Sequence, residues 1–369
     1  MFNFQPSSKL DLKKFIETKY FKKILVIAGS KSFAQSGLKE FFLSLKEKNI
    51  KFFFKKKPFP EFKELLEIVK EIEIYLPDLI IAAGGGSVLD YAKIANVIEL
   101  NSNIKREIIS SACKLKKKNR KLIAIPTTAG SGAEVTANAV IYINNIKYSI
   151  ESNLIKPDYF FLIPDFILGA SNKVKASAGF DAVAQAIESL ISRKSNKESV
   201  NYATQSLNLS LQHFINFLSK PNYENTCGMA FAANLSGKAI SISKTTAPHA
   251  LSYPFTSTFN ISHGHAVSLT LNQFMKFNYK NLHHADCDFN LKERFQILFN
   301  KTKTKNIDEF DAYFNTLKKN ANLECDFSKL GIDIKKFIPK LIEETSEQRL
   351  KNNPIKISKD IIRFLVLDS

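Results

Sequence analysis

The stretch LIIAAGGGSVLDYAKI, residues 79–94, constrains the fold of this chain more than any other. Its apolar run Leu79–Ala83 predicts a buried strand that leads directly into three glycines. A helical pattern follows over residues 87–100, with Ser87 and Asp90 spaced as in a capping box. Glycines let the backbone approach a ligand closely, and the start of a helix attracts anions such as pyrophosphate. The pattern is neither GxGxxG nor a Walker loop, so a purely structural turn is the alternative.

A second loop of the same kind follows another apolar run. Residues 122–125, LIAI, predict a strand that continues into PTTAGSGAEVT. This loop combines the paired Thr127 and Thr128 with Ser131, which stands between two glycines. Two such loops at the ends of strands in one sheet suit a nucleotide lying across the strand ends. A plain hairpin connection is the alternative.

Strand and helix patterns alternate in the N-terminal part of the chain. The apolar runs that predict strands lie at residues 23–28, 51–54, 79–83 and 122–125, and residues 60–71 predict a helix. This order is typical of an α/β fold with a parallel sheet. After Pro164 and Asp165 the patterns are almost all helical, separated by polar loops at residues 193–197, 220–224 and 352–354. We therefore expect an α/β domain over residues 1–166 and an all-α domain over residues 167–369.

Composition argues against several classes of protein. With 369 residues and 44% apolar content, the chain can form one large or two ordinary globular domains. No run approaches the length of a membrane span, and the N-terminal MFNFQPSSKLDLKKF has no secretory apolar core. The four cysteines lie far apart and fit no zinc-ribbon spacing. Reduced thiols and a cytoplasmic location are the expectation.

The formal net charge of +18 comes from lysines scattered along the whole chain. The densest runs, Lys55–Lys57 and Lys116–Lys118, lie beside turn-like segments and match no known nucleic-acid-binding module. A solvated surface is the simplest interpretation, and attraction of an anionic substrate is the next. Neither a nucleic-acid partner nor a membrane partner is expected, and a homodimer stays open.

Three of the six histidines fall within residues 245–271. They are His249, His263 and His265, and two imidazoles with one carboxylate make an adequate site for a divalent metal. The carboxylate has to come from elsewhere in the chain. Asp181, in the helical pattern GFDAVAQAIES, is a candidate. The alternative is that these histidines are ordinary core or surface residues.

Four motifs in this order resemble those of the iron-containing alcohol dehydrogenase family. They are GGGSxxDxxK at residues 84–93, PTTxGSGxE at 126–134, GxDAxxxAIE at 179–188, and HAxxxP at 249–254 with a later HG pair at 263–264. The resemblance runs through nearly the whole chain. It implies an N-terminal nucleotide-binding domain and a helical metal- and substrate-binding domain, in the dehydroquinate synthase-like fold. It also implies an NAD(P)-dependent oxidoreductase that acts on an alcohol or aldehyde and holds a divalent metal.

The family's usual metal site contains one aspartate and three histidines, and this chain departs from it. Asp181, His249 and His263 match the pattern, whereas Gln185 stands where the remaining histidine is usual. Gln185 can offer only a neutral amide oxygen, which is a weaker ligand than imidazole, so Zn²⁺ rivals Fe²⁺ as the metal. Tyr253 replaces a further active-site histidine. The proton donor stays open among Tyr253, His265, bound water and a ribose hydroxyl.

A narrower resemblance, carried by residues 234–271 and by the glutamine in FDAVAQAIES, is to the phosphonoacetaldehyde reductase branch. Members of that branch reduce phosphonoacetaldehyde to 2-hydroxyethylphosphonate. Lys238, Lys244 and Thr245 are candidates for binding such a small anion, although both lysines also suit a solvated helix face. The alternatives are another small alcohol or aldehyde, or a glycerol-phosphate dehydrogenase-like or dehydroquinate synthase-like reaction.

The cofactor is expected to lie against the two glycine-containing loops. In NAD-preferring relatives an aspartate often follows the first strand, but here Gly29 holds that position and Lys31 follows it. A 2′-phosphate is therefore not repelled, so NADPH is allowed and NADH stays open. Asp90 and Lys93 can order the loop instead of touching the cofactor. The expected cofactor-binding residues are Gly29, Lys31, Gly84, Gly85, Gly86, Ser87, Asp90, Thr127, Thr128 and Ser131.

Overall fold

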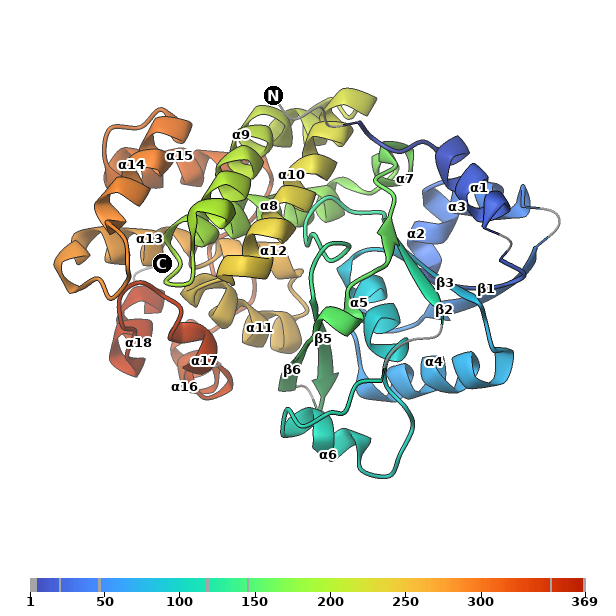
Figure 1. The fold of residues 1–369 in the computed structure, drawn as a ribbon. Helices are drawn as coiled ribbons and strands as arrows, with labels where there is room; N and C mark the ends of the chain where they lie inside the picture. Colours follow the sequence, from blue (N-terminus) through green and yellow to red (C-terminus); the bar gives the residue numbers. More distant parts are fainter. Residues whose placement is uncertain are drawn as a thin grey trace. The chain divides into compact units, whose positions relative to one another are not determined.

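The computed structural model describes residues 5–19, 21–45, 48–116, 120–144, 146–345 and 347–367 (Figure 1). Two residues of the predicted basic run, Lys117 and Lys118, therefore lie outside the described residues. The chain packs into two compact units. One comprises Met1–Ala170 with Asn222–Phe231, and the other comprises Ser171–Pro221 with Ala232–Ser369. The boundary expected after residue 166 precedes this division, and the assignment of residues 222–231 to the first unit was not expected.

A five-stranded parallel sheet forms the centre of the first unit. Its strands are β1 (Lys23–Gly29), β2 (Asn49–Lys55), β3 (Leu79–Gly84), β4 (Lys121–Pro126) and β7 (Tyr159–Phe160), in the spatial order β2-β1-β3-β4-β7. Every residue of β3 is buried, which explains why it is an uninterrupted apolar run instead of an alternating pattern. The predicted parallel α/β sheet is confirmed.

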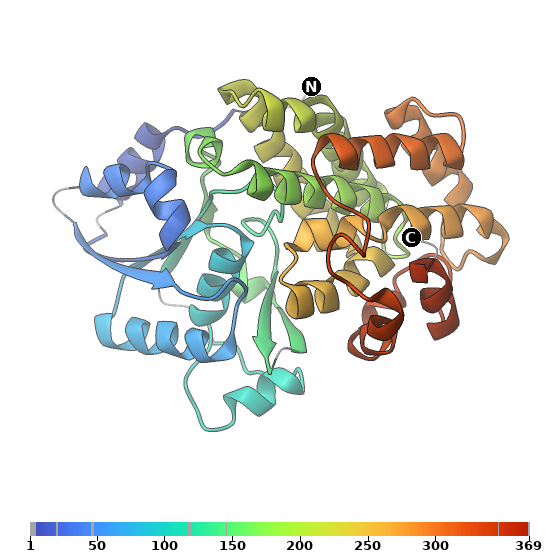
Figure 2. The ribbon, with the colours of Figure 1, turned by 180° about the vertical axis from the view of Figure 1, so that it is seen from behind.

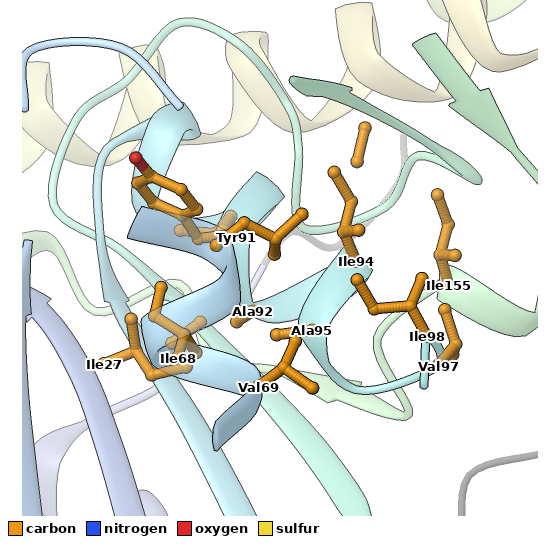
Figure 3. Close-up of a cluster of buried hydrophobic side chains, with 14 of the residues drawn as sticks. Ile27, Ile68, Val69, Tyr91, Ala92, Ile94, Ala95, Val97, Ile98 and Ile155 are labelled. Atoms are coloured by element: carbon orange, nitrogen blue, oxygen red, sulfur yellow. The ribbon is translucent and has the colours of Figure 1, made fainter. Parts of the chain in front are cut away.

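Helices pack on both faces of this sheet, and alternate residues of β1 belong to different hydrophobic clusters. Leu25 and Ile27 pack with α4 (Phe62–Tyr75) and α5 (Gly86–Ala95), as Figure 3 shows for part of that cluster. Ile24 and Val26 pack on the other face with α1 (Lys9–Thr18), α2 (Ser30–Gln35) and α3 (Leu38–Leu43). Side chains packed on both faces therefore hold the strands in place, and with them the loops that follow the strands.

An antiparallel hairpin accompanies the sheet, and the sequence interpretation missed it. It consists of β5 (Asn138–Ile143) and β6 (Ile146–Glu151), which follow the second glycine-containing loop. The shorter elements of this unit are α6 (Ile104–Ile109), η1 (Asn153–Ile155) and α7 (Pro164–Leu168). Helix α5 ends at Ala95, so the helix predicted over residues 87–100 is shorter than expected.

The second unit is helical, and Figure 2 shows its later helices from behind. Its longest helices are α8 (Asn172–Ile191), α9 (Lys197–Ser219) and α10 (Tyr223–Ser243), the last of which begins in residues grouped with the first unit. The following elements are α11 (Ala247–Phe259), α12 (His263–Ser268), α13 (Leu271–Lys280), η2 (Leu282–His284), α14 (Leu291–Thr302), α15 (Ile307–Asn320), α16 (Ile334–Glu344), α17 (Glu347–Leu350) and α18 (Lys359–Leu367).

Helix α8 is the central helix of this unit. From Lys175 to Ile191 it is buried at all but one of its residues, and it packs against α9 and α12. Alanine, serine and glycine make up much of this segment, and small side chains let neighbouring helices approach closely. In the part of the chain that the structure describes, no helix combines the length and apolarity needed to cross a membrane.

Candidate active site

The two glycine-containing loops lie against each other at the carboxyl edge of the sheet in the first unit. Strands β3 and β4 are neighbours, and the Thr127 amide donates a hydrogen bond to the Gly84 carbonyl at 3.0 Å. A Cβ at Gly86 would come within 2.8 Å of the Ser131 hydroxyl oxygen, and one at Gly84 within 2.5 Å of Val88. The missing side chain at Gly86 therefore permits a close contact between the two loops, whereas the one at Gly84 leaves room for Val88 of α5.

The expected capping box at the start of α5 is wrong. The helix begins at Gly86, its N-cap is Gly85 in an extended conformation, and no side chain caps it. The Asp90 carboxylate instead accepts a hydrogen bond from the Val140 amide at 3.2 Å. A helix whose N-terminus is not capped by its own side chains retains amide groups for an external anion, so this start suits a pyrophosphate.

Lys93 ties α5 to the second loop from within the core. Its buried ammonium donates to the Ala133 carbonyl at 3.0 Å, the Thr136 hydroxyl at 2.8 Å and the Asn138 carbonyl at 2.6 Å. Burial lowers the pKa of Lys93 to about 8, although Asp90 and Glu134 act in the opposite direction. Burial also raises the pKa of Asp90 to about 6, against the nearby charge of Lys93. These contacts favour the interpretation that Asp90 and Lys93 order the loops.

The other expected cofactor residues are spread around the same edge. A Cβ at Gly29 would lie 3.9 Å from the Val88 side chain, which places the end of β1 beside the start of α5. Lys31 is exposed on α2, and Thr128 and Ser131 are half-buried. Thr127 is buried, and its hydroxyl has no hydrogen-bond partner within the described part of the chain. A buried hydroxyl of this kind fits a site that is completed by a polar ligand.

The helical unit brings together the three residues expected to hold a metal. Asp181 comes from α8, His249 from α11 and His263 from the first position of α12, and one ligand atom of each lies within 4.8 Å of the others. The Asp181 Oδ1 atom is 3.1 Å from His249 Nε2 and 4.0 Å from His263 Nε2. Asp181 and His249 are buried, whereas the His263 side chain is 35% exposed. The cluster is therefore accessible on the His263 side.

Gly264 accounts for the position of His263. A Cβ at Gly264 would lie 2.0 Å from the Ser177 carbonyl oxygen and 2.8 Å from the Asp181 Cβ. Only glycine lets α12 approach α8 this closely, and the approach places the neighbouring His263 beside Asp181. The HG pair in the sequence therefore combines a candidate ligand, His263, with the glycine that allows α12 to pack on α8.

Glu188 is a site residue whose role the sequence interpretation missed. It is fully buried, and its carboxylate accepts hydrogen bonds from His249 Nδ1, from the Thr246 amide at 2.7 Å and from the Thr246 hydroxyl at 2.8 Å. The bond to Nδ1 orients the imidazole so that Nε2 faces Asp181, the usual arrangement behind a histidine ligand. The sequence signal is the spacing of two helical turns from Asp181 to Glu188, which puts both carboxylates on one face of α8.

The electrostatics of this cluster favour a cation. Burial alone would lower the pKa of His249, but Glu188 and Asp181 together raise it to about 9. Burial alone would raise the pKa of Asp181, but the hydrogen bond from His249 and the charge on His263 lower it. Two carboxylates around one imidazole create a negative potential at Nε2. One carboxylate and two imidazole nitrogens are also a common donor set for Fe²⁺ and Zn²⁺, so these residues fit the implied metal.

Gln185 has a different position from that of a simple fourth ligand. Its Oε1 atom accepts a hydrogen bond from the Ser236 hydroxyl at 2.9 Å, and its side chain donates to the Asp181 carboxylate. The amide oxygen, the atom that would bind a metal, is thus engaged by Ser236. In this arrangement Gln185 orients Asp181, and its metal ligation stays a prediction.

The two candidate proton donors have different surroundings. The Tyr253 ring stacks on His263 with centroids 5.2 Å apart, and its hydroxyl accepts a hydrogen bond from Arg349 at 2.7 Å. The His265 Nε2 atom is 2.6 Å from the Glu324 carbonyl oxygen, to which it donates, and burial lowers the pKa of His265. Tyr253 therefore lies directly against the cluster. His265, in contrast, uses its Nε2–H to bind the backbone carbonyl of Glu324.

The residues expected to bind the substrate lie along and after α10. The Lys238 ammonium is 5.8 Å from the centre of the Tyr202 ring on α9. Lys244 adopts a left-handed conformation, with φ of 60°, at the end of α10. Thr245 is buried, and its carbonyl accepts a hydrogen bond from Asn352 at 2.8 Å. These contacts fix the segment that precedes Thr246, but they do not test its role in substrate binding.

Comparison with known proteins identifies relatives of both units. Residues 2–164 match the family model for iron-containing alcohol dehydrogenase, and residues 175–368 match that for the C-terminal part of the Fe-containing alcohol dehydrogenase family. The phosphonoacetaldehyde reductase of Streptomyces viridochromogenes is 28% identical over 58% of this chain and 56% of that protein. The 4-hydroxybutyrate dehydrogenase of Clostridium kluyveri is 30% identical over 60% of each chain. The aligned parts thus span less than two thirds of these relatives' length.

Solved structures extend the likeness to the whole chain. The sulfoacetaldehyde reductase of Bifidobacterium kashiwanohense, solved with NAD⁺, is 25% identical with a TM-score of 0.85, covering 99% of this chain and 97% of that one. The iron-containing alcohol dehydrogenase of Thermococcus thioreducens is 22% identical with a TM-score of 0.86, covering 99% and 96%, and shows the same fold. On the match of both family models, the chain belongs to the iron-containing alcohol dehydrogenase family.

Proposed function

We propose that the protein is a metal-dependent, NAD(P)H-linked oxidoreductase that interconverts a small aldehyde and its alcohol. The observation that carries this proposal is the buried cluster of Asp181, His249 and His263, which is open on the His263 side. A divalent ion held by these residues would act as a Lewis acid on the aldehyde oxygen. The uncapped start of α5 and the loop at Thr127 and Thr128 would bind NADH or NADPH, which supplies the hydride.

The remaining residues of the site support these two functions. Glu188 holds His249 in the tautomer that presents Nε2, and Gln185 holds the Asp181 carboxylate. Lys93 keeps the second loop against α5. The proton for the alcohol oxygen comes, in this proposal, from bound water, a ribose hydroxyl, Tyr253 or His265, and the Tyr253 ring lies against His263.

For the substrate we propose phosphonoacetaldehyde, reduced to 2-hydroxyethylphosphonate. Support comes from the relative of that name, and from two others whose named substrates are also short chains that end in an anion, a sulfonate and a carboxylate. A neutral short aldehyde is the second candidate, because the 1-propanol dehydrogenase of Salmonella typhimurium is 28% identical over 60% of this chain.

The test is oxidation of NADH and NADPH by the purified protein after loading with Fe²⁺ or Zn²⁺ and analysis of its metal content. Phosphonoacetaldehyde, sulfoacetaldehyde, succinic semialdehyde and propanal serve as substrates. His263→Ala should lose bound metal and aldehyde reduction together, because it removes a ligand. His284→Ala, which changes an exposed histidine, is the matched control and should retain both. Full turnover and full metal content in His263→Ala would exclude the proposed site.

A further inference from the structure

A continuous line of contacts leads from the metal cluster to a cation. The rings of His263 and Tyr253 are stacked, with an angle of 7° between their planes and 5.2 Å between their centroids. Arg349 on α17 donates from Nη1 to the Tyr253 hydroxyl at 2.7 Å, and its guanidinium carbon is 5.0 Å from the centre of the same ring. The side chain of Tyr253 therefore contacts both a guanidinium and a candidate metal ligand.

Tyr253 and Arg349 form one arrangement. Tyr253 lies one helical turn after His249 on α11, which places both side chains on the same face. Tyr253 is buried and Arg349 is half-buried. The phenol provides both a flat surface and a hydroxyl acceptor, so it holds the guanidinium in one orientation and removes it in part from water. A charge held in this way binds an anion more strongly than a mobile surface charge does.

We propose that Arg349 binds the anionic end of the substrate, with Tyr253 as its positioning residue. This inference rests on the proposed function, namely that the aldehyde end of the substrate binds at the cluster of Asp181, His249 and His263. A planar guanidinium presents two parallel N–H donors that match the oxygens of a phosphonate, sulfonate or carboxylate. Arg349 would then determine the preference for aldehydes that carry an anion over neutral aldehydes of similar length.

The described contacts favour Arg349 over the two lysines that the sequence interpretation selected. The Lys238 ammonium lies over Tyr202 of α9, and Lys244 occupies the left-handed turn that ends α10. Tyr253, in contrast, connects Arg349 directly to His263. Arginine also offers a bidentate geometry that an ammonium does not have.

The experiment compares kcat/KM for phosphonoacetaldehyde, sulfoacetaldehyde and succinic semialdehyde with that for propanal and butanal. In Arg349→Met the ratio of anionic to neutral aldehyde should fall by about 10- to 100-fold, mainly through KM, because a charge-assisted hydrogen bond is lost. Arg349→Lys should have a ratio between those of Arg349→Met and the wild type, because lysine keeps the positive charge but lacks the two parallel N–H donors of the guanidinium. Tyr253→Phe keeps the stacked ring but removes the hydroxyl that holds Arg349, and should give an intermediate fall.

Arg363→Met, which changes an exposed arginine on α18, is the matched control and should leave the ratio as in the wild type. The anionic aldehyde whose kcat/KM falls most in Arg349→Met identifies the anion that Arg349 recognises. An unchanged ratio in both Arg349→Met and Arg349→Lys would overturn the inference. If Arg349→Met does not fold, Arg349→Lys provides the same comparison, because it should lower the ratio of anionic to neutral aldehyde in part.

A binding measurement separates failure of this inference from failure of the proposed function. Ethylphosphonate contains two carbons and the anion but no aldehyde, and its binding to the metal-loaded protein can be followed by calorimetry. Weaker binding in Arg349→Met, together with no turnover of any aldehyde, would support the anion site and refute the reductase. Turnover of aldehydes with equal ethylphosphonate binding in wild type and Arg349→Met would refute the anion site alone.

Discussion

Gly264→Ala should disrupt the metal cluster although it leaves every ligand in place. The added Cβ would lie 2.0 Å from the Ser177 carbonyl oxygen and 2.9 Å from the Asp181 amide nitrogen. Carbon and carbonyl oxygen seldom approach closer than about 3.3 Å, so α8 and α12 would have to separate by about 1 Å. Overpacking of this kind costs about 1–3 kcal/mol. A site whose ligands must be held to within about 0.5 Å would also lose metal affinity, by about 10- to 100-fold.

The assay combines thermal unfolding of the metal-free protein with titration of Fe²⁺ or Zn²⁺. Gly331→Ala is the control, because Gly331 has φ of +71° and nothing lies within 4 Å of the Cβ position. An alanine in that conformation costs about 1–2 kcal/mol, so Gly331→Ala should lower stability without changing metal affinity. Gly264→Ala should lower both. Wild-type metal affinity in Gly264→Ala would show that the close packing of α12 on α8 does not position His263.

Two further predictions concern buried carboxylates. Glu188→Gln should weaken metal binding by about 10- to 100-fold, because an amide no longer fixes the tautomer of His249. An unchanged affinity in a metal titration would contradict this role of Glu188. Asp90 has a pKa of about 6 in the folded protein against 3.8 unfolded, so its protonated form is favoured by folding. Its stabilising effect is complete below pH 3.8 and is lost as the pH rises through about 6, a change of about 3 kcal/mol. Urea unfolding of Asp90→Asn should lack this change, and a pH profile identical to that of the wild type would refute it.

The sequence predicted the features that depend on local patterns. Buried parallel strands are continuous apolar runs, and for this reason β1, β3 and β4 could be placed almost to the residue. The hairpin β5–β6 was missed, although Asn144 and Asn145 stand between two apolar runs as a turn signal. Its outer strand is only half-buried along most of its length, so the apolar pattern there is weak.

The features that were missed depend on partners remote in the sequence. Asp90 resembles a capping residue at short range, but its partner Val140 is 50 residues away. Arg349 is 96 residues from Tyr253, and no local pattern around either residue indicates their contact. Glu188 was within a recognised motif, yet its role depends on the packing of α8 against the segment at Thr246. A single sequence shows which residue types are present at a site, whereas these roles depend on tertiary packing.

The two departures from the usual histidines can be understood through such remote partners. Gln185 is held by Ser236, which is buried on α10, and it donates to Asp181 in place of supplying an imidazole. Tyr253 is held by Arg349 and supplies a ring surface against His263. Glutamine and tyrosine are neutral, as unprotonated histidines are, so the presence of Gln185 and Tyr253 in place of histidines does not change the charge of the cluster. Arg349 places a positive charge against the Tyr253 ring, which stacks on His263. If the aldehyde binds at the cluster as proposed, this arrangement suits a short substrate whose far end is anionic.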